Sequence, residues 1–181
     1  MTIDLHELQA RIEAAAAELG REALQKGLVY VTAESCTAGG VSYAVTQIAG
    51  SSAWFDRGFV TYTNEAKQQL LGVRSETLKA HGAVSEETAR EMALGALCAC
   101  PKANCAASVT GIAGPGGAVP GKPVGTVCFG FAFRAEGTAQ PTVKTATEHF
   151  AGGRSEVRMQ SILRALDGLI EASAQRKNFS L

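Results

Sequence analysis

The sequence lacks an excess of charge of either sign. Lysine and arginine together number 17, as do aspartate and glutamate, so the formal net charge is zero at pH 7. A chain without net positive charge exerts little long-range attraction on a polyanion. We therefore do not expect nucleic acid as a partner, although a local basic group can still hold a single phosphate.

Long hydrophobic runs are also missing. The longest obvious one, residues 127–133, is only as long as a strand, whereas a membrane-spanning helix needs about 20 apolar residues. The opening residues, Met1 to His6, do not show the basic and then apolar pattern of a secretion signal. The expectation is a cytoplasmic protein with no membrane partner.

The five cysteines are too thinly spread along the chain to form a disulfide framework. An odd number of cysteines in a chain of this size is typical of a reducing compartment. Cys98, Cys100 and Cys105 do not have the paired C-x-x-C spacing of a zinc site. We expect no metal.

What is present suits a single folded domain. The chain has 181 residues, of which 46% are apolar and 19% charged, a composition that can bury a substantial core. No internal repeat or linker interrupts it. The sequence therefore predicts one domain over residues 1–181.

The order of hydrophobic patterns predicts the fold class. Helical spacing covers residues 4–26, about 39–49, 64–71, a segment beginning at Ser85, and 155–174. Runs of β-branched and aromatic residues predict strands at 28–32, 58–62, 105–109, 124–134 and 142–150, the last two joined by a turn at Glu136-Gly137. The prediction is one α/β domain with a central mixed sheet covered by helices.

The first candidate site is the loop after the first predicted strand. Glu34, Ser35, Cys36 and Thr37 stand one residue before the pair Gly39-Gly40, where a helix N-terminus is expected. A nucleophile there would face free backbone N–H groups that can hold an oxyanion or a phosphate. The alternative is that Ser35 and Thr37 only cap the helix.

The second candidate loop follows the next predicted strand. Tyr62 ends that strand and Lys67 lies in the first turn of the following helix. A lysine beside a serine in a desolvated cleft can act as a base, with tyrosine relaying a proton, although a surface lysine is the more ordinary outcome. A serine–histidine–aspartate set has little support, since only His81 is expected in a loop between helices.

The third loop is rich in glycine and runs from Gly111 to Pro123. Its lysine and glycine spacing imitates a phosphate-binding P-loop, but Pro123 stands where serine or threonine is needed and a strand follows instead of a helix. A nucleoside triphosphatase is thereby disfavoured. Thr110, at the strand end, could hydrogen-bond a ligand, and Arg154 is a natural partner for a phosphate or carboxylate, unless it is simply exposed.

Seven motifs together carry a family resemblance. They are residues 32–37 (TAESCT) with Gly39, 48–52 (IAGSS), 58–62 (GFVTY), 64–67 (NEAK), 81–86 (HGAVSE), 109–117 (VTGIAGPGG) and 122–126 (KPVGT). In this order, over about residues 8–172, they resemble the C-terminal domain family of the competence/damage-inducible protein CinA. The resemblance is closest to members that consist of this domain alone.

The resemblance implies a fold, a reaction and site residues. The family has a three-layer α/β/α domain, forms homodimers or higher homo-oligomers, and hydrolyses the carboxamide of nicotinamide mononucleotide to nicotinate mononucleotide and ammonia, without metal or cofactor. Carried onto matching positions, Ser35 is the expected nucleophile, with Lys67 and Tyr62 assisting proton transfer. The expected substrate-binding or supporting residues are Glu34, Thr37, Thr110, Gly111 and Arg154.

The chain departs from the family pattern at two places. Many members have glycine where this chain has Ala38, and a bulky residue where it has Gly40. Many also carry acidic residues in the segment that here reads Ala118-Val-Pro-Gly121. The first departure affects packing around the first turn of the predicted helix, and the second affects the ligand contacts of the glycine-rich loop.

Three alternatives remain open from the sequence. Cys36 is a second candidate nucleophile, since a thiol pKa can be lowered at a helix N-terminus. The chain could instead be a non-catalytic nucleotide-binding or regulatory module. A protein-interaction scaffold in competence or DNA damage responses rests only on the family's name, and the sequence has no basic stripe to support it.

Overall fold

A computed structural model describes residues 4–135 and 140–174, so the predicted turn at Glu136-Gly137 lies outside the described residues. The helices are α1 (Leu5–Lys26), α2 (Gly40–Thr46), the short 3₁₀ helix η1 (Ser51–Ala53), α3 (Asn64–Leu71), α4 (Ser75–His81), α5 (Glu86–Ala99) and α6 (Arg154–Ser173). The strands are β1 (Tyr30–Glu34), β2 (Phe55–Val60), β3 (Cys105–Gly111), β4 (Thr126–Phe133) and β5 (Thr142–His149).

The five strands form one mixed sheet in the order β2-β1-β3-β4-β5. Strands β2 and β3 run parallel to β1, whereas β4 and β5 are antiparallel to their neighbours. Glu34, the last residue of β1, pairs with Val60 on β2 and with Val109 on β3. The carboxyl ends of three strands therefore meet at one edge of the sheet, where ligands of α/β proteins commonly bind.

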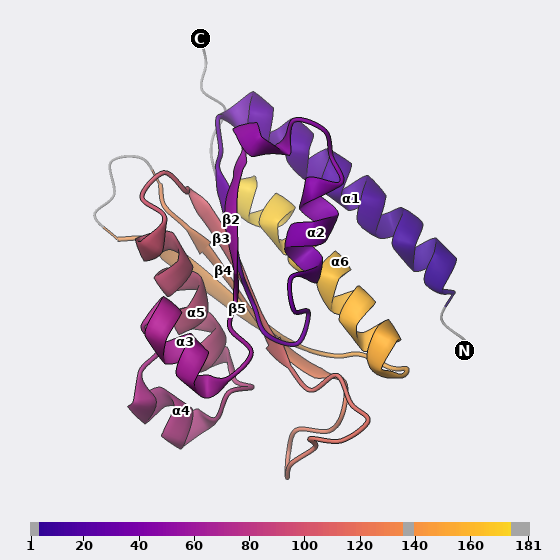
Figure 1. Cartoon of the computed structure of the whole chain (residues 1–181), viewed down its shortest axis with the longest axis vertical. Helices are drawn as coiled ribbons and strands as arrows, with labels where there is room; N and C mark the ends of the chain where they lie inside the picture. The colour runs from indigo at the N-terminus through magenta and orange to yellow at the C-terminus, as the bar shows by residue number, and fades with distance from the viewer. Residues whose placement is uncertain (1–3, 136–139, 175–181) are drawn as a thin grey trace.

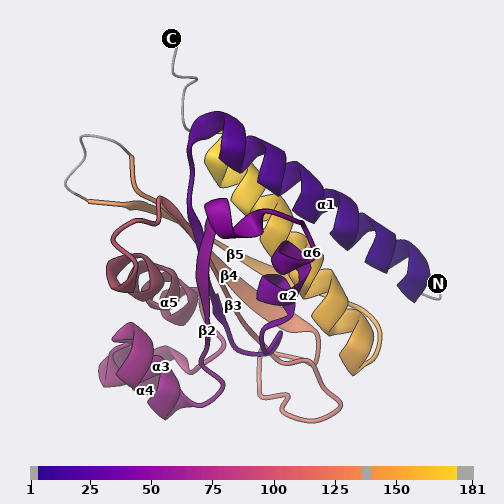
Figure 2. The ribbon, with the colours of Figure 1, turned by 45° about the horizontal axis from the view of Figure 1, so that its top comes forward.

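Helices cover both faces of this sheet (Figures 1 and 2). Helices α1, α2 and α6 lie on one side, and α3, α4 and α5 lie on the other. Each side has its own buried cluster of hydrophobic residues against the sheet. The predicted α/β class, with a central mixed sheet between two helical layers, is confirmed.

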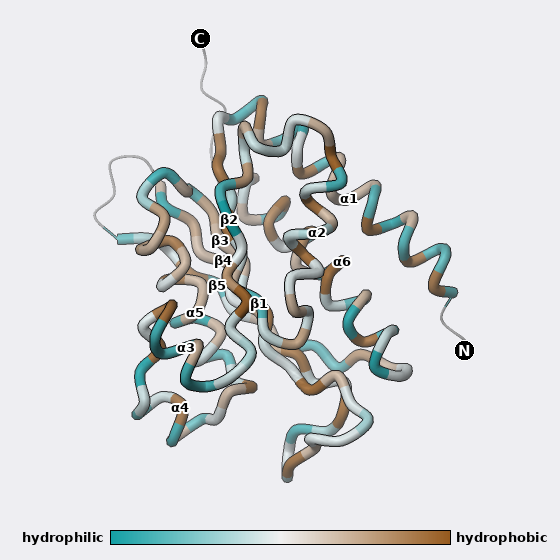
Figure 3. Tube along the Cα trace, in the orientation of Figure 1, coloured by the Kyte–Doolittle hydropathy of each residue, from teal (hydrophilic) through white to brown (hydrophobic). Residues whose placement is uncertain are grey.

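The burial of each element explains its sequence pattern. Every residue of β1 and of β4 is buried, so neither strand shows the alternation of polar and apolar residues that is typical of a half-exposed strand. Helix α1 shows hydrophilic and hydrophobic residues in alternation along its length (Figure 3), because only one face packs inward. No helix in the described ranges is long and apolar enough to cross a membrane.

Several predicted boundaries were wrong. Strand β1 covers Tyr30–Glu34 rather than 28–32, and β2 covers Phe55–Val60 rather than 58–62. Strand β2 is at the edge of the sheet, where charged residues are common. Because Asp56 and Arg57 are charged and exposed, the first half of the strand does not form an apolar run in the sequence.

Helix α4 was not predicted, and it ends with His81, which we expected in a loop. Its N-cap, Arg74, makes no side-chain capping bond, and only Thr77 and Leu78 in it are buried, so neither a cap nor a periodic stripe marks it. Helix α3 is capped by Thr63, and the helix expected to begin at Ser85 begins at Glu86, with Ser85 as its N-cap.

Replacement of Gly95 by alanine is expected to destabilise the fold. A Cβ at this position in α5 would lie 1.9 Å from the backbone oxygen of Leu71, which a rotamer change cannot relieve. The expected loss in the free energy of unfolding is about 1–3 kcal/mol, measured by chemical denaturation. Gly116→Ala is the matched control because its Cβ would enter open space, and an equal loss in both variants would contradict the packing argument.

Candidate active site

The loop after β1 is a tight turn whose anchor is Glu34. Helix α2 begins at Gly40, and its N-cap, Gly39, makes no side-chain hydrogen bond, so the alternative that Ser35 and Thr37 only cap this helix was wrong. The Glu34 carboxylate does the capping from the end of β1, by accepting the backbone N–H groups of Val41 at 3.0 Å and Ser42 at 2.9 Å. It thus neutralises the positive end of α2.

Side-chain hydroxyls complete the environment of this carboxylate. Thr37 Oγ1 donates to it at 2.8 Å, Ser42 Oγ at 2.7 Å and Thr32 Oγ1 at 3.2 Å. Glu34 and Thr37 are both fully buried. These bonds satisfy the carboxylate inside the fold, so the two residues support the turn that carries Ser35.

Ser35 and Lys67 meet at the edge of the sheet. Lys67 Nζ donates to Ser35 Oγ at 2.9 Å and to the backbone oxygens of Thr61 at 2.8 Å and Tyr62 at 3.3 Å. Lys67 is only 1% exposed, and no carboxylate of the described chain lies within ion-pair distance of it. Burial therefore lowers the pKa of Lys67 to about 8.

The three acceptors around Lys67 suit a general base. Two are carbonyl oxygens, which can only accept, so two N–H bonds of the amine are directed at Thr61 and Tyr62. When the amine is neutral, its lone pair remains for the third neighbour, the Ser35 hydroxyl. The geometry thus orients the neutral lysine to accept the serine proton.

Tyr62 lies two residues beyond β2, and Arg154 bridges it to the glycine-rich loop. Arg154 Nη2 donates to the Tyr62 hydroxyl at 3.2 Å, and Nη1 donates to the backbone oxygen of Gly114 at 2.8 Å. Both residues are exposed. The side chains of Tyr62 and Arg154 thus come together, and the Tyr62 hydroxyl keeps its own proton to donate to a ligand.

Thr110 and Gly111 have structural roles in this arrangement. Thr110 is buried, and its hydroxyl donates to the backbone oxygen of Ala83 at 2.7 Å, which ties β3 to the segment before α5. A Cβ at Gly111 would lie 2.7 Å from Val127 Cγ2 and 2.9 Å from the backbone oxygen of Thr126. Glycine at 111 therefore lets β3 and β4 approach each other at the edge where the site lies.

The structure argues against Cys36 as the nucleophile. Its thiol is buried, and burial raises its pKa to about 11, the reverse of the lowered pKa that a reactive thiolate needs. None of the five cysteines, all of which lie in the described ranges, forms a disulfide. Within residues 4–135 and 140–174, no three His, Cys, Asp or Glu side chains are placed to hold a metal ion.

The segment that imitates a P-loop makes hydrogen bonds within the protein. Lys122 Nζ donates to the backbone oxygen of His81 at 2.7 Å, and Val119 and Lys122 pair with each other across a short turn. Strand β4, not a helix, follows this loop. The interpretation against a nucleoside triphosphatase is therefore supported by the local structure.

Comparison with known proteins decides the family. Residues 12–173 match the model of the CinA C-terminal domain. The chain belongs to the CinA C-terminal domain family. Nicotinamide-nucleotide amidohydrolase PncC of Escherichia coli K12 is 53% identical over 152 residues, which is 84% of this chain and 88% of the relative.

Other CinA relatives agree with this assignment. PncC of Pseudomonas putida is 41% identical over 88% of this chain and 96% of its own. The crystal structure of a competence/damage inducible protein from Agrobacterium tumefaciens has a TM-score of 0.84 and 45% identity, covering 90% of this chain and 95% of that chain. Similarity to solved structures thus extends over nearly the whole CinA domain.

The first of the two expected departures, at Ala38 and Gly40, lies in this turn. Ala38 has a φ of 50°, in the left-handed region that favours glycine. A Cβ at Gly40 would lie 2.5 Å from Ile162 Cδ1, so α6 fills the space that a side chain at position 40 would need.

Arg158, on α6, is a contact of the turn that sequence reasoning missed. Its Nη2 donates to the backbone oxygen of Thr37 at 3.0 Å. Its position four residues after Arg154 was an available signal, because residues at this spacing share a helix face.

Proposed function

We propose that this protein hydrolyses the carboxamide of nicotinamide mononucleotide to nicotinate mononucleotide and ammonia, with Ser35 as nucleophile. The observation that carries the proposal is the contact between Ser35 Oγ and Lys67 Nζ at 2.9 Å, with Lys67 buried. A neutral amide is a poor electrophile, so its hydrolysis needs an activated nucleophile. The names of the PncC relatives support the choice of substrate.

The first half of the reaction forms an ester on Ser35. Neutral Lys67 takes the Ser35 proton as Oγ bonds to the carboxamide carbon, and the carbonyl oxygen becomes an oxyanion. When this intermediate collapses, the lysine ammonium gives its proton to the departing nitrogen, which leaves as ammonia. The acyl group of the nucleotide remains on Ser35.

The second half regenerates the enzyme. Lys67 takes a proton from a water molecule, whose oxygen attacks the ester carbon. The bond to Ser35 Oγ breaks, and Oγ recovers a proton from Lys67. The product acid ionises to the carboxylate, nicotinate mononucleotide, and its proton goes to solvent.

Backbone N–H groups of the turn are the proposed oxyanion donors. The N–H of Ser35 is bonded to Val109 and that of Ala38 to Ser35, both through carbonyl oxygens. We assign the role to the other N–H groups of residues 36–39, which the Glu34 carboxylate holds in place through Thr37. Arg154 is the proposed contact for the polar part of the nucleotide, and Tyr62, whose hydroxyl keeps its own proton, is proposed to assist Lys67 in proton transfer.

The rate is expected to rise with pH and level off near the pKa of Lys67. Because only the neutral amine can accept the serine proton and burial lowers its pKa to about 8, kcat/KM should rise about tenfold per pH unit well below that value. The measurement is ammonia release from nicotinamide mononucleotide across this range. A rate that does not change between neutral and alkaline pH would contradict a lysine base.

A further inference from the structure

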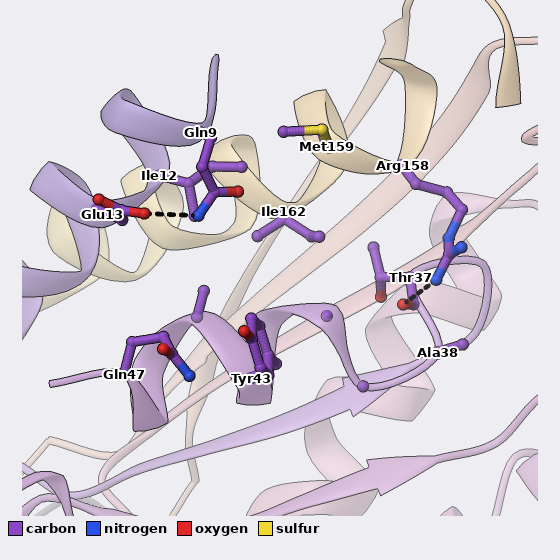
Figure 4. Close-up of a pocket in the computed structure, with 13 residues that line it drawn as sticks. Gln9, Ile12, Glu13, Thr37, Ala38, Tyr43, Gln47, Arg158, Met159 and Ile162 are labelled. Carbon is purple, nitrogen blue, oxygen red and sulfur yellow. Dashed lines mark hydrogen bonds between the residues drawn. The ribbon is translucent and has the colours of Figure 1, made fainter. Parts of the chain in front are cut away.

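A cavity lies next to the turn that carries Ser35, where helices α1, α2 and α6 meet (Figure 4). Its volume is about 210 Å³, and its walls are largely apolar side chains, namely Ile12, Tyr43, Ala44, Met159 and Ile162. One end is formed by residues 37–40 of the turn, and Ser35 does not line it. A dry protein cavity of about 150 Å³ can hold benzene, so this one has room for a single aromatic ring with one small substituent.

The cavity depends on the absence of a side chain at position 40. Gly40 lines it, and a Cβ there would lie 2.5 Å from Ile162 Cδ1, the far end of a flexible side chain. Gly40 does not have a positive φ, so its backbone would accept a larger residue. A bulky side chain at position 40 would therefore fill the cavity rather than break the turn.

The end of the cavity next to the turn carries an unpaired positive charge. Arg158 donates from Nη2 to the Thr37 backbone oxygen at 3.0 Å, its Nε is buried without a hydrogen-bond partner, and no carboxylate of the described chain lies within ion-pair distance. The acidic group that lines the cavity, Glu13, lies at the opposite end, where it accepts a bond from Gln9 (Figure 4). A planar guanidinium without a counter-ion is well suited to a carboxylate.

We propose that this cavity binds a small aromatic carboxylate, with its ring among the apolar side chains and its carboxylate on Arg158. Such a ligand competes with the Thr37 backbone oxygen for the guanidinium. Since Thr37 belongs to the turn that presents Ser35, occupancy of the cavity shifts this turn. The cavity is then a regulatory site, separate from the contact between Ser35 and Lys67.

Direct binding of benzoate to the whole chain tests the proposal. By isothermal titration calorimetry we expect a dissociation constant of about 1 mM, typical for a ligand of this size. Benzamide has the same shape without the charge, and it should bind at least about tenfold more weakly. Arg158→Gln should weaken benzoate binding to a similar extent.

Two cavity-closing variants locate the site. Gly40→Leu fills the cavity from the turn, and Gln47→Trp covers its rim from the exposed C-cap position of α2, where a larger side chain does not disturb the core. Both should lose benzoate binding while keeping a native circular dichroism spectrum. Absence of benzoate binding to the wild-type chain, unchanged binding in folded Gln47→Trp, or equal binding of benzoate and benzamide would each overturn the proposal. None of these measurements depends on hydrolysis, so failure of the proposed reaction would be seen separately.

Discussion

Lys67→Met is expected to abolish hydrolysis and to make the protein more stable. Methionine keeps much of the volume of the side chain but cannot take the Ser35 proton, so kcat should fall by roughly a thousandfold or more. Because the buried ammonium has no carboxylate partner, its removal relieves a desolvation cost. Activity and stability therefore change in opposite directions, which a purely structural lysine would not produce.

The stability gain should depend on pH in a defined way. The pKa of Lys67 is lowered from 10.5 to about 8 on folding, so the unfolded chain binds more protons between these values and wild-type stability rises with pH across them. The penalty removed by Lys67→Met is on the order of 3 kcal/mol below pH 8, before subtraction of the lost hydrogen bonds. It should disappear above about pH 10.5.

Chemical denaturation of both proteins across this range measures the difference. Gln68→Met, on the same helix but exposed, is the matched control. If Lys67→Met were less stable than wild type at neutral pH, Lys67 would be held by its hydrogen bonds rather than strained by burial, and its assignment as a base would lose its physical reason.

Ser35→Ala should remove the activity while leaving the fold and substrate binding in place. The residue supplies the oxygen that attacks the amide carbon, and loss of a nucleophile typically lowers kcat by about 10⁴-fold or more. The Ser35 hydroxyl accepts a hydrogen bond from Lys67 Nζ and makes none with Glu34. The variant therefore keeps every hydrogen bond of the Glu34 carboxylate, which holds the turn. Ammonia release and calorimetric binding of nicotinamide mononucleotide separate these two effects.

Cys36→Ser is the control next to it in the chain. Its buried thiol has a raised pKa and no assigned chemical role, so the variant should retain activity within about tenfold, allowing for a buried hydroxyl. Ammonia release by Ser35→Ala at the wild-type rate, or a loss confined to Cys36→Ser, would assign the attack to another residue.

The sequence allowed the meeting of Ser35 and Lys67 to be anticipated. Ser35 follows one strand, Lys67 lies in the first helical turn after another, and parallel neighbours place their carboxyl ends side by side. The burial of Lys67 could not be predicted in the same way. Its segment, Asn64-Glu-Ala-Lys67, is polar, and only the fold shows that this one side chain turns inward.

The role of Glu34 was beyond the sequence for another reason. A carboxylate between a strand and a helix is equally compatible with a ligand contact or with an internal cap, and the choice depends on which donors the turn brings within reach. Here Val41, Ser42 and Thr37 fill its acceptor positions. The hydrogen bond of Thr110 could not be predicted from the sequence either, because its acceptor, Ala83, is 27 residues away along the chain.

The wild-type protein itself provides the most direct test of the central claim, that the turn after β1 and Lys67 form an amidase site. The measurement is a time course of ammonia and nicotinate mononucleotide released from nicotinamide mononucleotide above the lysine pKa of about 8. We predict equal amounts of both products over many turnovers. Saturable binding of the nucleotide with no release of ammonia would contradict the account and favour a non-catalytic binding module.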